Sequence, residues 1–553
     1  METINQILAR ELGREQTHID NVIKLLDEGN TIPFIARYRK ELHGAMDDTA
    51  LRMLAERLEY LRSLAERRET VKNSIAEQGK MTEELAAAID GAQTLAALED
   101  IYRPYKPKRR TRATVAREKG LWPLAEEIFS QRAGLPAPEV MAADYVDAEK
   151  GVETVEDALA GASDIIAEII SDDADIRGAL RRFIESNAFL VSKAATEEDS
   201  VYRLYYDFRQ RVDRVQGHQV LAVNRGEKEG FLKVGIELDR ELALQRVRRA
   251  VIVPGSAAMA FVRAAADDAY DRLIWPSMER EERSALTDAA CEGAIKMFAL
   301  NLKPLLMQPP VKGKVTMGLD PGYRNGCKVA VIDGTGKVLD TAVVYPTLSE
   351  ARKKDAIRTL SALIRKHGVE HIAIGNGTAS RETEQMTVEM LHELGGGQSY
   401  AIVNEAGASV YSASPLAAEE FPDYDVNLRS AVSIARRLQD PLAELVKIDP
   451  MAIGVGQYQH DMPQSKLAET LDGVVEDCVN AVGVDINTAS PSLLQRVSGL
   501  TKTTAKNIVA YREENGAFTS RREINKVPKL GPKAFEQCAG FLRVPESRQV
   551  LDN

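Results

Sequence analysis

Residues 317–333, MGLDPGYRNGCKVAVID, decide the fold of the central part of the chain. A short apolar run ends on the carboxylate of Asp320, and a Pro-Gly turn follows at once. A second apolar run begins after the turn and reaches Ile332. Because proline and glycine favour tight turns, this pattern predicts two neighbouring antiparallel strands, with Asp320 exposed at the edge of the sheet.

Further apolar runs on both sides of this stretch predict a mixed sheet. The runs of strand length are residues 315–319, 328–332, 338–345, 372–374 and 401–403. Short turns join the first three runs, so these strands should be antiparallel. Amphipathic segments precede the last two, so these strands should be added in parallel by helical crossovers. This order of elements is that of an RNase H-like α/β domain.

Two acidic residues are the candidate catalytic and metal-binding groups of this domain. Asp320 ends the first predicted strand, and Glu405 follows the last one. Carboxylates at neighbouring strand ends can share Mg²⁺ for phosphodiester hydrolysis. A nuclease of this fold also needs acids on the last helix, but the early turns of that helix carry Arg429, Ser430 and Arg436. We therefore predict a non-catalytic domain, with a Mg²⁺-dependent structure-specific nuclease that uses Asp320 and Glu405 as the alternative.

The part of the chain before this domain is predicted to be mainly helical. Leucines at helical spacing support helices over most of residues 1–200. The segment 28–41, EGNTIPFIARYRKE, reads as a loop between two helices in a helix-turn-helix-like unit. In residues 217–238, two apolar runs flank the polar stretch 224–230, which predicts a β-hairpin.

The C-terminal part contains two similar helical repeats that resemble paired helix-hairpin-helix motifs. Gly499 lies in the first turn and Gly531 in the second, with Thr501 and Lys529 where a second turn glycine is usual. A turn glycine lets the backbone approach a phosphate, and the amides that begin the next helix bind its oxygens. Four lysines stand beside the turns and are candidate phosphate contacts: Lys502, Lys506, Lys529 and Lys533. Such contacts read no bases, so binding should be sequence-independent. The alternative is a pair of helices that only packs against protein.

A second basic island offers a rival nucleic-acid surface. Residues 103–119 hold eight Lys or Arg and one Glu, in a chain of 553 residues with a formal net charge of −11. Its candidate contact residues are Lys106, Lys108, Arg109, Arg110 and Arg112. Basic islands in an acidic chain suit local phosphate binding, although a solvated charged face has the same composition.

Features of the whole sequence argue against a membrane-spanning, secreted or disulfide-bonded protein. No apolar run reaches the length of a membrane span, and the N-terminus lacks a signal-peptide pattern. We therefore expect a cytoplasmic location and no membrane partner. The four cysteines lie far apart with no C-x-x-C spacing, so disulfides and structural zinc are not expected.

The chain is predicted to be a multi-domain, mainly α-helical protein. The expected parts are a helical N-terminal domain (1–200), a helical and β-hairpin central region (201–314), the RNase H-like domain (315–447), a helical connector (448–482) and the tandem helix-hairpin-helix domain (483–553).

Several longer stretches of the sequence resemble the motifs of known protein families. GLDPGYRNGCKVAVID, IGNGTASRETE and VNEAGASVYSAS resemble the YqgF/RuvC-like branch of the RNase H superfamily. TIPFIARYRKE, LEDIYRPYKPKRRTRA and NRGEKEG resemble the bacterial transcription accessory protein Tex family.

This resemblance implies a nucleic-acid-binding transcription accessory protein. Its expected partners are single-stranded or duplex RNA or DNA and the transcription machinery, RNA polymerase included. No cofactor is expected, and Mg²⁺ belongs only to the nuclease alternative. Chains of this family normally continue into an OB-fold RNA-binding domain that this sequence lacks, so we expect a truncated form.

Overall fold

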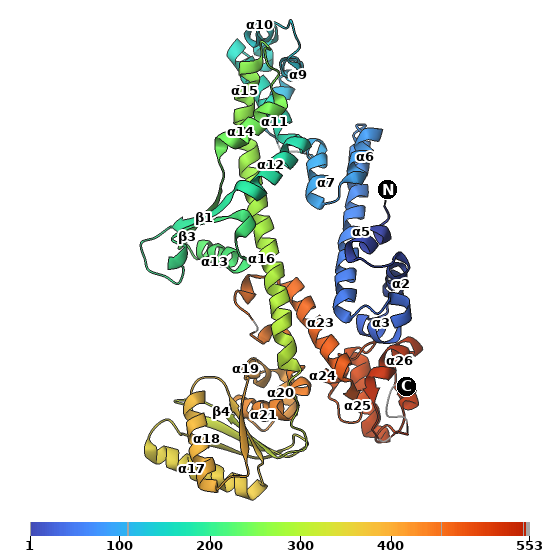
Figure 1. Cartoon of the computed structure of the whole chain (residues 1–553), viewed down its shortest axis with the longest axis vertical. Helices are drawn as coiled ribbons and strands as arrows, with labels where there is room; N and C mark the ends of the chain where they lie inside the picture. Colours follow the sequence, from blue (N-terminus) through green and yellow to red (C-terminus); the bar gives the residue numbers. More distant parts are fainter. Residues whose placement is uncertain (1, 108–109, 455, 546, 549–553) are drawn as a thin grey trace. The chain divides into compact units, whose positions relative to one another are not determined.

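The computed structural model describes residues 2–107, 110–454, 456–545 and 547–548. The chain folds into two compact units, each made of two separate stretches. The first contains Met1–Arg14 and Leu54–Ala294, and the second contains Glu15–Met53 and Ile295–Asn553. Helices dominate both units, as predicted (Figure 1). The predicted boundaries within these units stay predictions.

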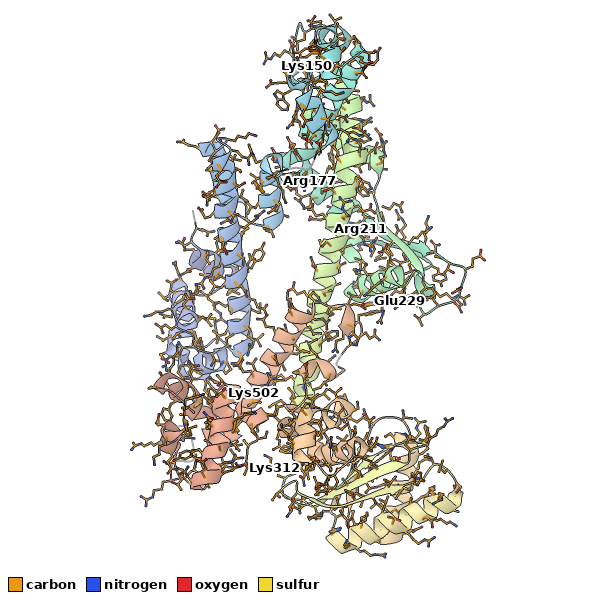
Figure 2. The ribbon with its side chains drawn as sticks, turned by 180° about the vertical axis from the view of Figure 1, so that it is seen from behind. Lys150, Arg177, Arg211, Glu229, Lys312 and Lys502 are labelled. Carbon is orange, nitrogen blue, oxygen red and sulfur yellow. The ribbon has the colours of Figure 1, made fainter. Side chains whose placement is uncertain are left out.

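The first unit is built from helices around a small sheet. Its helices are α1 (Ile4–Leu12), most of α5 (Asp48–Glu77), α6 (Glu83–Gly91), α7 (Leu95–Tyr102), α8 (Arg112–Glu118), α9 (Trp122–Ser130), α10 (Pro138–Ala142), α11 (Val155–Asp172), α12 (Ala174–Asn187), α13 (Gly217–Lys228), α14 (Arg240–Val251), α15 (Met259–Asp268) and the first part of α16 (Trp275–Leu306). Arg177 of α12 is buried among them and donates to Asp100 at 3.0 Å (Figure 2).

The predicted β-hairpin at residues 217–238 is wrong. Its first arm is helix α13, and only the second arm is a strand, β3 (Leu232–Glu237). β3 pairs antiparallel with β1 (Phe189–Ala194), which also pairs with β2 (Asp207–Arg211). A run of four buried apolar residues fits a helix as well as a strand, and a capping box at Gln216 starts the helix here.

Most of the segment 28–41, predicted as a loop, is helical instead. Between α2 (Gln16–Asp27) and α5 it forms α3 (Ile32–Tyr38) and α4 (Lys40–His43). Pro33 lies in the first turn of α3, where its missing N–H costs no helical hydrogen bond. Pro33, Phe34 and Ile35 are buried. The proline that suggested a break therefore begins a helix.

The second unit contains the RNase H-like sheet with its strands and helices in the predicted order along the chain. The strands are β4 (Thr316–Asp320), β5 (Cys327–Ile332), β6 (Val338–Val344), β7 (His371–Gly375) and β8 (Ser399–Val403). They lie in the order β6-β5-β4-β7-β8. β5 is antiparallel to β4 and β6, whereas β7 is parallel to β4 and β8. The predicted directions are therefore confirmed.

Helices cover both faces of this sheet (Figure 1). On one face, α17 (Glu350–His367) and α18 (Ser380–Leu394) pack on Met317 and Leu319 of β4. On the other, α21 (Val426–Gln439) packs on β5 and β7. Gly318 lets α21 approach β4, because a Cβ there would lie 2.8 Å from Ala435 Cβ and 2.9 Å from Ala435 N.

The rest of the second unit is helical. Its remaining elements are α19 (Ala408–Ser412), α20 (Pro415–Glu420), α22 (Pro441–Leu445), α23 (Gln464–Val482), β9 (Val484–Asp485), α24 (Pro491–Leu494), α25 (Lys502–Asn515), η9 (Arg521–Lys526), α26 (Pro532–Cys538) and β10 (Leu542–Arg543). α23 leads directly into the two C-terminal repeats.

Candidate nucleic-acid interface and acidic site

The acidic pair lies at one edge of the mixed sheet. β4, β7 and β8 are parallel, so their carboxyl ends meet at the same edge. Asp320 is the last residue of β4, and Glu405 follows β8 by two residues. Burial raises the pKa of Glu405, and the charge of Asp320 raises it further. Asp320 is therefore close enough for its charge to act on Glu405.

The loop after β7 fits closely around Glu405. The backbone N–H of Glu405 donates to Asn376 Oδ1 at 3.0 Å. A side chain on Gly375 or on Gly377 would collide with the Glu405 carboxylate. The Gly377 N–H donates to that carboxylate, but Glu405 Oε2 has no hydrogen-bond partner among the described residues. The two glycines thus make room for a carboxylate that is incompletely satisfied.

Helix α21 brings a hydroxyl and a cation to this edge. Ser430 donates a hydrogen bond to Asp320, which partly offsets the rise in the Asp320 pKa that burial causes. Arg437, two turns later, is only 3% exposed and donates to the carbonyls of Asn404 at 2.7 Å and Ala406 at 2.8 Å. Burial lowers the pKa of Arg437 to about 10, against the charges of Glu444 and Glu405.

The residues at this edge fit a Mg²⁺ ion poorly. Magnesium takes oxygen ligands in a strict octahedron and is repelled by nearby cations. Here the charges of Lys328 and Arg437 act on Asp320 and Glu405, respectively. In the part of the chain that the structure describes, no group of three or more His, Cys, Asp and Glu is placed to hold a metal ion. Sequence reasoning missed Arg437, although its seven-residue spacing from Ser430 puts both on one helix face.

Both C-terminal repeats form helical hairpins. The first is α24, a turn and α25, and the second is η9, a turn and α26. Gly499 and Lys529 occupy equivalent turn positions, with φ of +76° and +64°. Thr501 caps α25 through the N–H of Thr504, whereas Gly531 is the N-cap of α26. Apolar side chains form the core of the two hairpins: Leu494, Val497, Leu500, Ala505, Ile508, Ile524, Val527 and Leu530 are buried, and Ala534 is half-buried.

Gly499 is also a packing residue. A Cβ at this position would lie 2.7 Å from Gln537 Cβ and 3.1 Å from the Ala534 carbonyl oxygen, both on α26. The first turn therefore packs directly on the second hairpin, and a glycine is required for this contact as well as for its positive φ.

The four hairpin lysines have different surroundings. Lys502 and Lys506 are exposed on one face of α25, and Lys529 is exposed in the second turn (Figure 2 labels Lys502). No carboxylate within the described ranges pairs with these three. Lys533 is exposed too, but its Nζ donates to the carbonyl of Glu28. Sequence reasoning missed this contact, because Glu28 and Lys533 are 505 residues apart.

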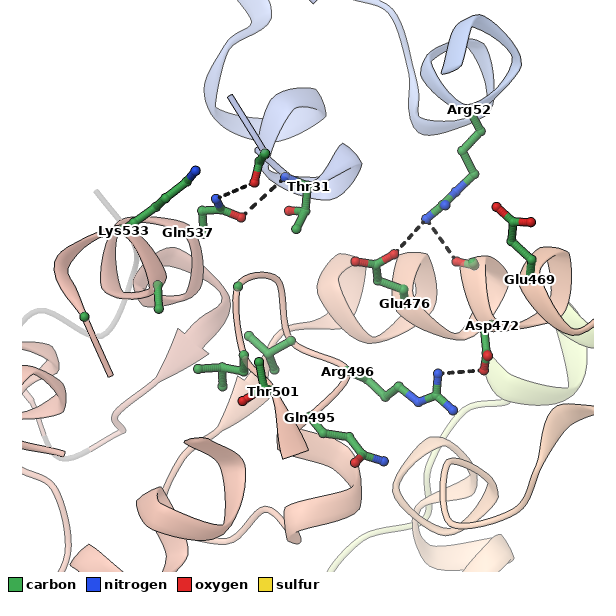
Figure 3. Close-up of a pocket in the computed structure, with 17 residues that line it drawn as sticks. Thr31, Arg52, Glu469, Asp472, Glu476, Gln495, Arg496, Thr501, Lys533 and Gln537 are labelled. Atoms are coloured by element: carbon green, nitrogen blue, oxygen red, sulfur yellow. Dashed lines mark hydrogen bonds and ion pairs between the residues drawn. The ribbon is translucent and has the colours of Figure 1, made fainter. Parts of the chain in front are cut away.

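A pocket of about 800 Å³ lies beside the two hairpin turns (Figure 3). Its walls come from residues 29–31, from α23 and from both hairpins. The acidic residues Asp472 and Glu476 of α23 line this pocket. Arg496 donates to Asp472 at 2.7 Å, and Arg52 donates to Glu476 at 3.2 Å. Arginine thus neutralises part of the acidic wall.

The rival basic island is partly neutralised by nearby carboxylates. Lys106 pairs with Glu99 at 3.4 Å, and Arg110 pairs with Glu118 at 3.3 Å. Arg112 is exposed at the start of α8. Lys108 and Arg109 lie outside the described residues.

Four family models match the chain in order. They are the Tex-like protein N-terminal domain at residues 2–76, the Tex central region-like model at 135–298, the Tex protein YqgF-like domain at 314–439 and the helix-hairpin-helix motif at 479–543. These models contain all of the motifs quoted above except LEDIYRPYKPKRRTRA (98–113), which lies between two matched ranges.

Relatives match over almost the whole chain. "Uncharacterized protein YdcI" of Bacillus subtilis is 49% identical, covering 100% of this chain and 78% of its own length. "Transcriptional accessory protein Tex" of Neisseria gonorrhoeae is 49% identical, covering 99% of this chain and 73% of its own length. Human "S1 RNA-binding domain-containing protein 1" is 40% identical, covering 98% of this chain and 56% of its own length. The chain thus belongs to the Tex family.

Proposed function

We propose that the chain is a nucleic-acid-binding transcription accessory protein that holds the phosphate backbone of RNA or DNA at its helical hairpins. The observation that carries this proposal is the first hairpin turn, which leads into α25 with Lys502 and Lys506 exposed and unpaired among the described residues. The first amides of a helix have no partner within the helix and attract anions. Lysines one turn apart add charge along a backbone.

This binding mode is expected to be independent of sequence. Contacts to phosphates position a protein but carry no base information, and they weaken as salt rises. The formal net charge of −11 disfavours broad attraction to nucleic acid, so the binding has to be local.

The names of relatives support a role beside the transcription machinery. One is named a transcriptional accessory protein and another an S1 RNA-binding domain-containing protein. We infer that this chain acts with RNA polymerase or an associated factor on nucleic acid. None of the helices in the described ranges is long and apolar enough to cross a membrane.

The RNase H-like domain is proposed to be non-catalytic. Asp320 and Glu405 face a serine and an arginine from α21, where a nuclease would supply carboxylates. A Mg²⁺-dependent nuclease would have to bind its metal against these cations. The domain instead serves as a scaffold in this proposal.

A binding assay tests the first proposal. Fluorescence anisotropy would measure affinity for labelled single-stranded and duplex RNA and DNA of two unrelated sequences. Reversing Lys502, Lys506, Lys529 and Lys533 to Glu should weaken binding to all of them by more than tenfold at moderate salt. A matched reversal of four island residues, Lys106, Lys108, Arg110 and Arg112, should have a smaller effect. Full loss only in the island variant would refute the hairpins as the main surface.

A cleavage assay tests the second proposal. Branched and linear DNA and RNA incubated with Mg²⁺ or Mn²⁺ should stay intact. Cleavage by the parent protein that disappears in Asp320→Ala would establish the nuclease alternative.

A further inference from the structure

We propose that the basic island at residues 103–119 and the neighbouring indole of Trp122 form a second nucleic-acid contact, which takes single strands by stacking one of their bases. This inference rests on the proposed nucleic-acid binding. It adds to the hairpins a surface that belongs to the first unit and names the class of strand that this surface holds.

Trp122 is an exposed aromatic side chain on a closely packed turn. It is the first residue of α9 and is 38% exposed. The turn before it is fixed, because Leu121 is buried and a Cβ on Gly161 of α11 would collide with the Leu121 side chain. The guanidinium of Arg117 lies over the indole, 4.7 Å from the ring centroid. Bases stack on aromatic rings and on guanidinium planes alike, so this pair offers a platform for a base.

A buried carboxylate holds the Arg117 side of this platform. Glu168 of α11 pairs with Arg117 at 3.3 Å through one oxygen and accepts from the Thr111 hydroxyl at 3.0 Å through the other. Thr111 is the N-cap of α8, and Arg117 lies in its last turn, so both ends of α8 are tied to α11. A platform that is already ordered loses little conformational freedom when a ligand binds.

Cations of the island surround the platform and suit a phosphate backbone. The Arg110 side chain is 74% exposed, and Arg112 is exposed at the first position of α8. Lys119 follows α8 and donates to the Gly151 carbonyl at 2.8 Å. Neither Arg112 nor Lys119 forms an ion pair with a carboxylate in the described part of the chain. A duplex keeps its bases stacked inside, so only a single strand can present a base to Trp122 while its phosphates meet these cations.

Intrinsic fluorescence tests this assignment, because the chain has only two tryptophans. Trp275 stacks on Tyr270 with ring centroids 6.1 Å apart, and Trp275→Phe keeps an aromatic ring there. In that full-length variant Trp122 is the only indole. Titration with single-stranded oligo(dT) or oligo(rU) should quench its fluorescence, whereas a duplex of the same length should not. Anisotropy of labelled strands measures binding in the same samples.

Substitution of the indole gives the matching affinity measurement. Trp122→Leu should weaken binding of oligo(dT) and oligo(rU) by about fivefold or more and leave duplex binding within about twofold of the parent. Trp122→Phe keeps a stacking ring and should retain most of the single-strand affinity. The side chain is exposed, so the melting temperature should change little in either variant.

The salt dependence tests the cations. Arg112→Gln with Lys119→Gln should lower the slope of log affinity against log salt by about 1.4 on oligo(dT). The control is Lys193→Gln with Lys233→Gln, which removes two exposed cations that face each other on β1 and β3. This control should leave the slope unchanged.

Each other outcome contradicts a definite part of the reasoning. A single strand that binds by anisotropy without quenching Trp122 would overturn this inference and leave the hairpin proposal standing. Equal quenching by the duplex would overturn the restriction to single strands. Failure of the parent protein to bind any nucleic acid would overturn the proposed function, and this inference with it.

Discussion

Replacing Gly318 by alanine should disrupt the close packing of α21, which carries Ser430 and Arg437, on β4, which ends at Asp320. The new Cβ would lie 2.8 Å from Ala435 Cβ, 2.9 Å from Ala435 N and closer still to the Ala431 carbonyl oxygen. Ordinary carbon contacts are about 3.5–4.0 Å, so relief requires α21 to move by about 1 Å. Backbone atoms and alanines have no rotamer to change, and the helix has to shift as a body.

The expected loss of unfolding free energy in Gly318→Ala is the difference between two opposing effects. Overpacking of a core costs about 1–3 kcal/mol, and a clash with backbone belongs at the upper end. Removing glycine from a strand returns about 0.5–1 kcal/mol. We therefore expect the domain to lose about 2 kcal/mol of unfolding free energy, which corresponds to about thirtyfold faster amide exchange in β4 and α21 if exchange follows domain opening.

Hydrogen-exchange mass spectrometry on the full chain measures this directly. Gly293→Ala in α16 is the matched control, because nothing lies within 4 Å of a Cβ there. That variant should keep or gain protection, since alanine favours helix over glycine by about 1 kcal/mol. Unchanged protection of β4 and α21 in Gly318→Ala would refute the packing argument.

Three further variants test the charges of the second unit. Ser430→Asp adds a third carboxylate beside Asp320 and should create Mn²⁺ binding, seen as a metal-dependent rise in melting temperature that the parent lacks. Asp320→Asn should raise the melting temperature at pH 7. Burial raises the Asp320 pKa above its unfolded value of 3.8, so ionisation costs stability at neutral pH; the gain should vanish as the pH falls below about 4. Arg52→Met removes the guanidinium that pairs with Asp477 and Glu476 and should cost about 2 kcal/mol in chemical denaturation. Adding Asp477→Asn should recover part of this loss, and the double-mutant cycle measures the coupling.

The sequence by itself determined the elements whose signals are local. Asp320 before a Pro-Gly turn, followed by apolar runs and two amphipathic helices, predicted the strands of the mixed sheet and their directions. The two similar repeats around the turn glycines Gly499 and Gly531 predicted both hairpins. These signals work because the period of side-chain burial follows from the geometry of strands and helices. The same reasoning was wrong at residues 217–228, where a short apolar run fits either period.

Only the tertiary structure decided which distant residues meet. It placed Arg437 beside Glu405, paired β3 with β1, and brought residues 28–31 into contact with both C-terminal hairpins. No local period encodes these contacts, because each depends on two surfaces that fit after the chain has folded. Lys533 illustrates the difference. Its sequence neighbours predict a phosphate contact, but in the folded chain its ammonium group donates a hydrogen bond to the carbonyl of Glu28, 505 residues away.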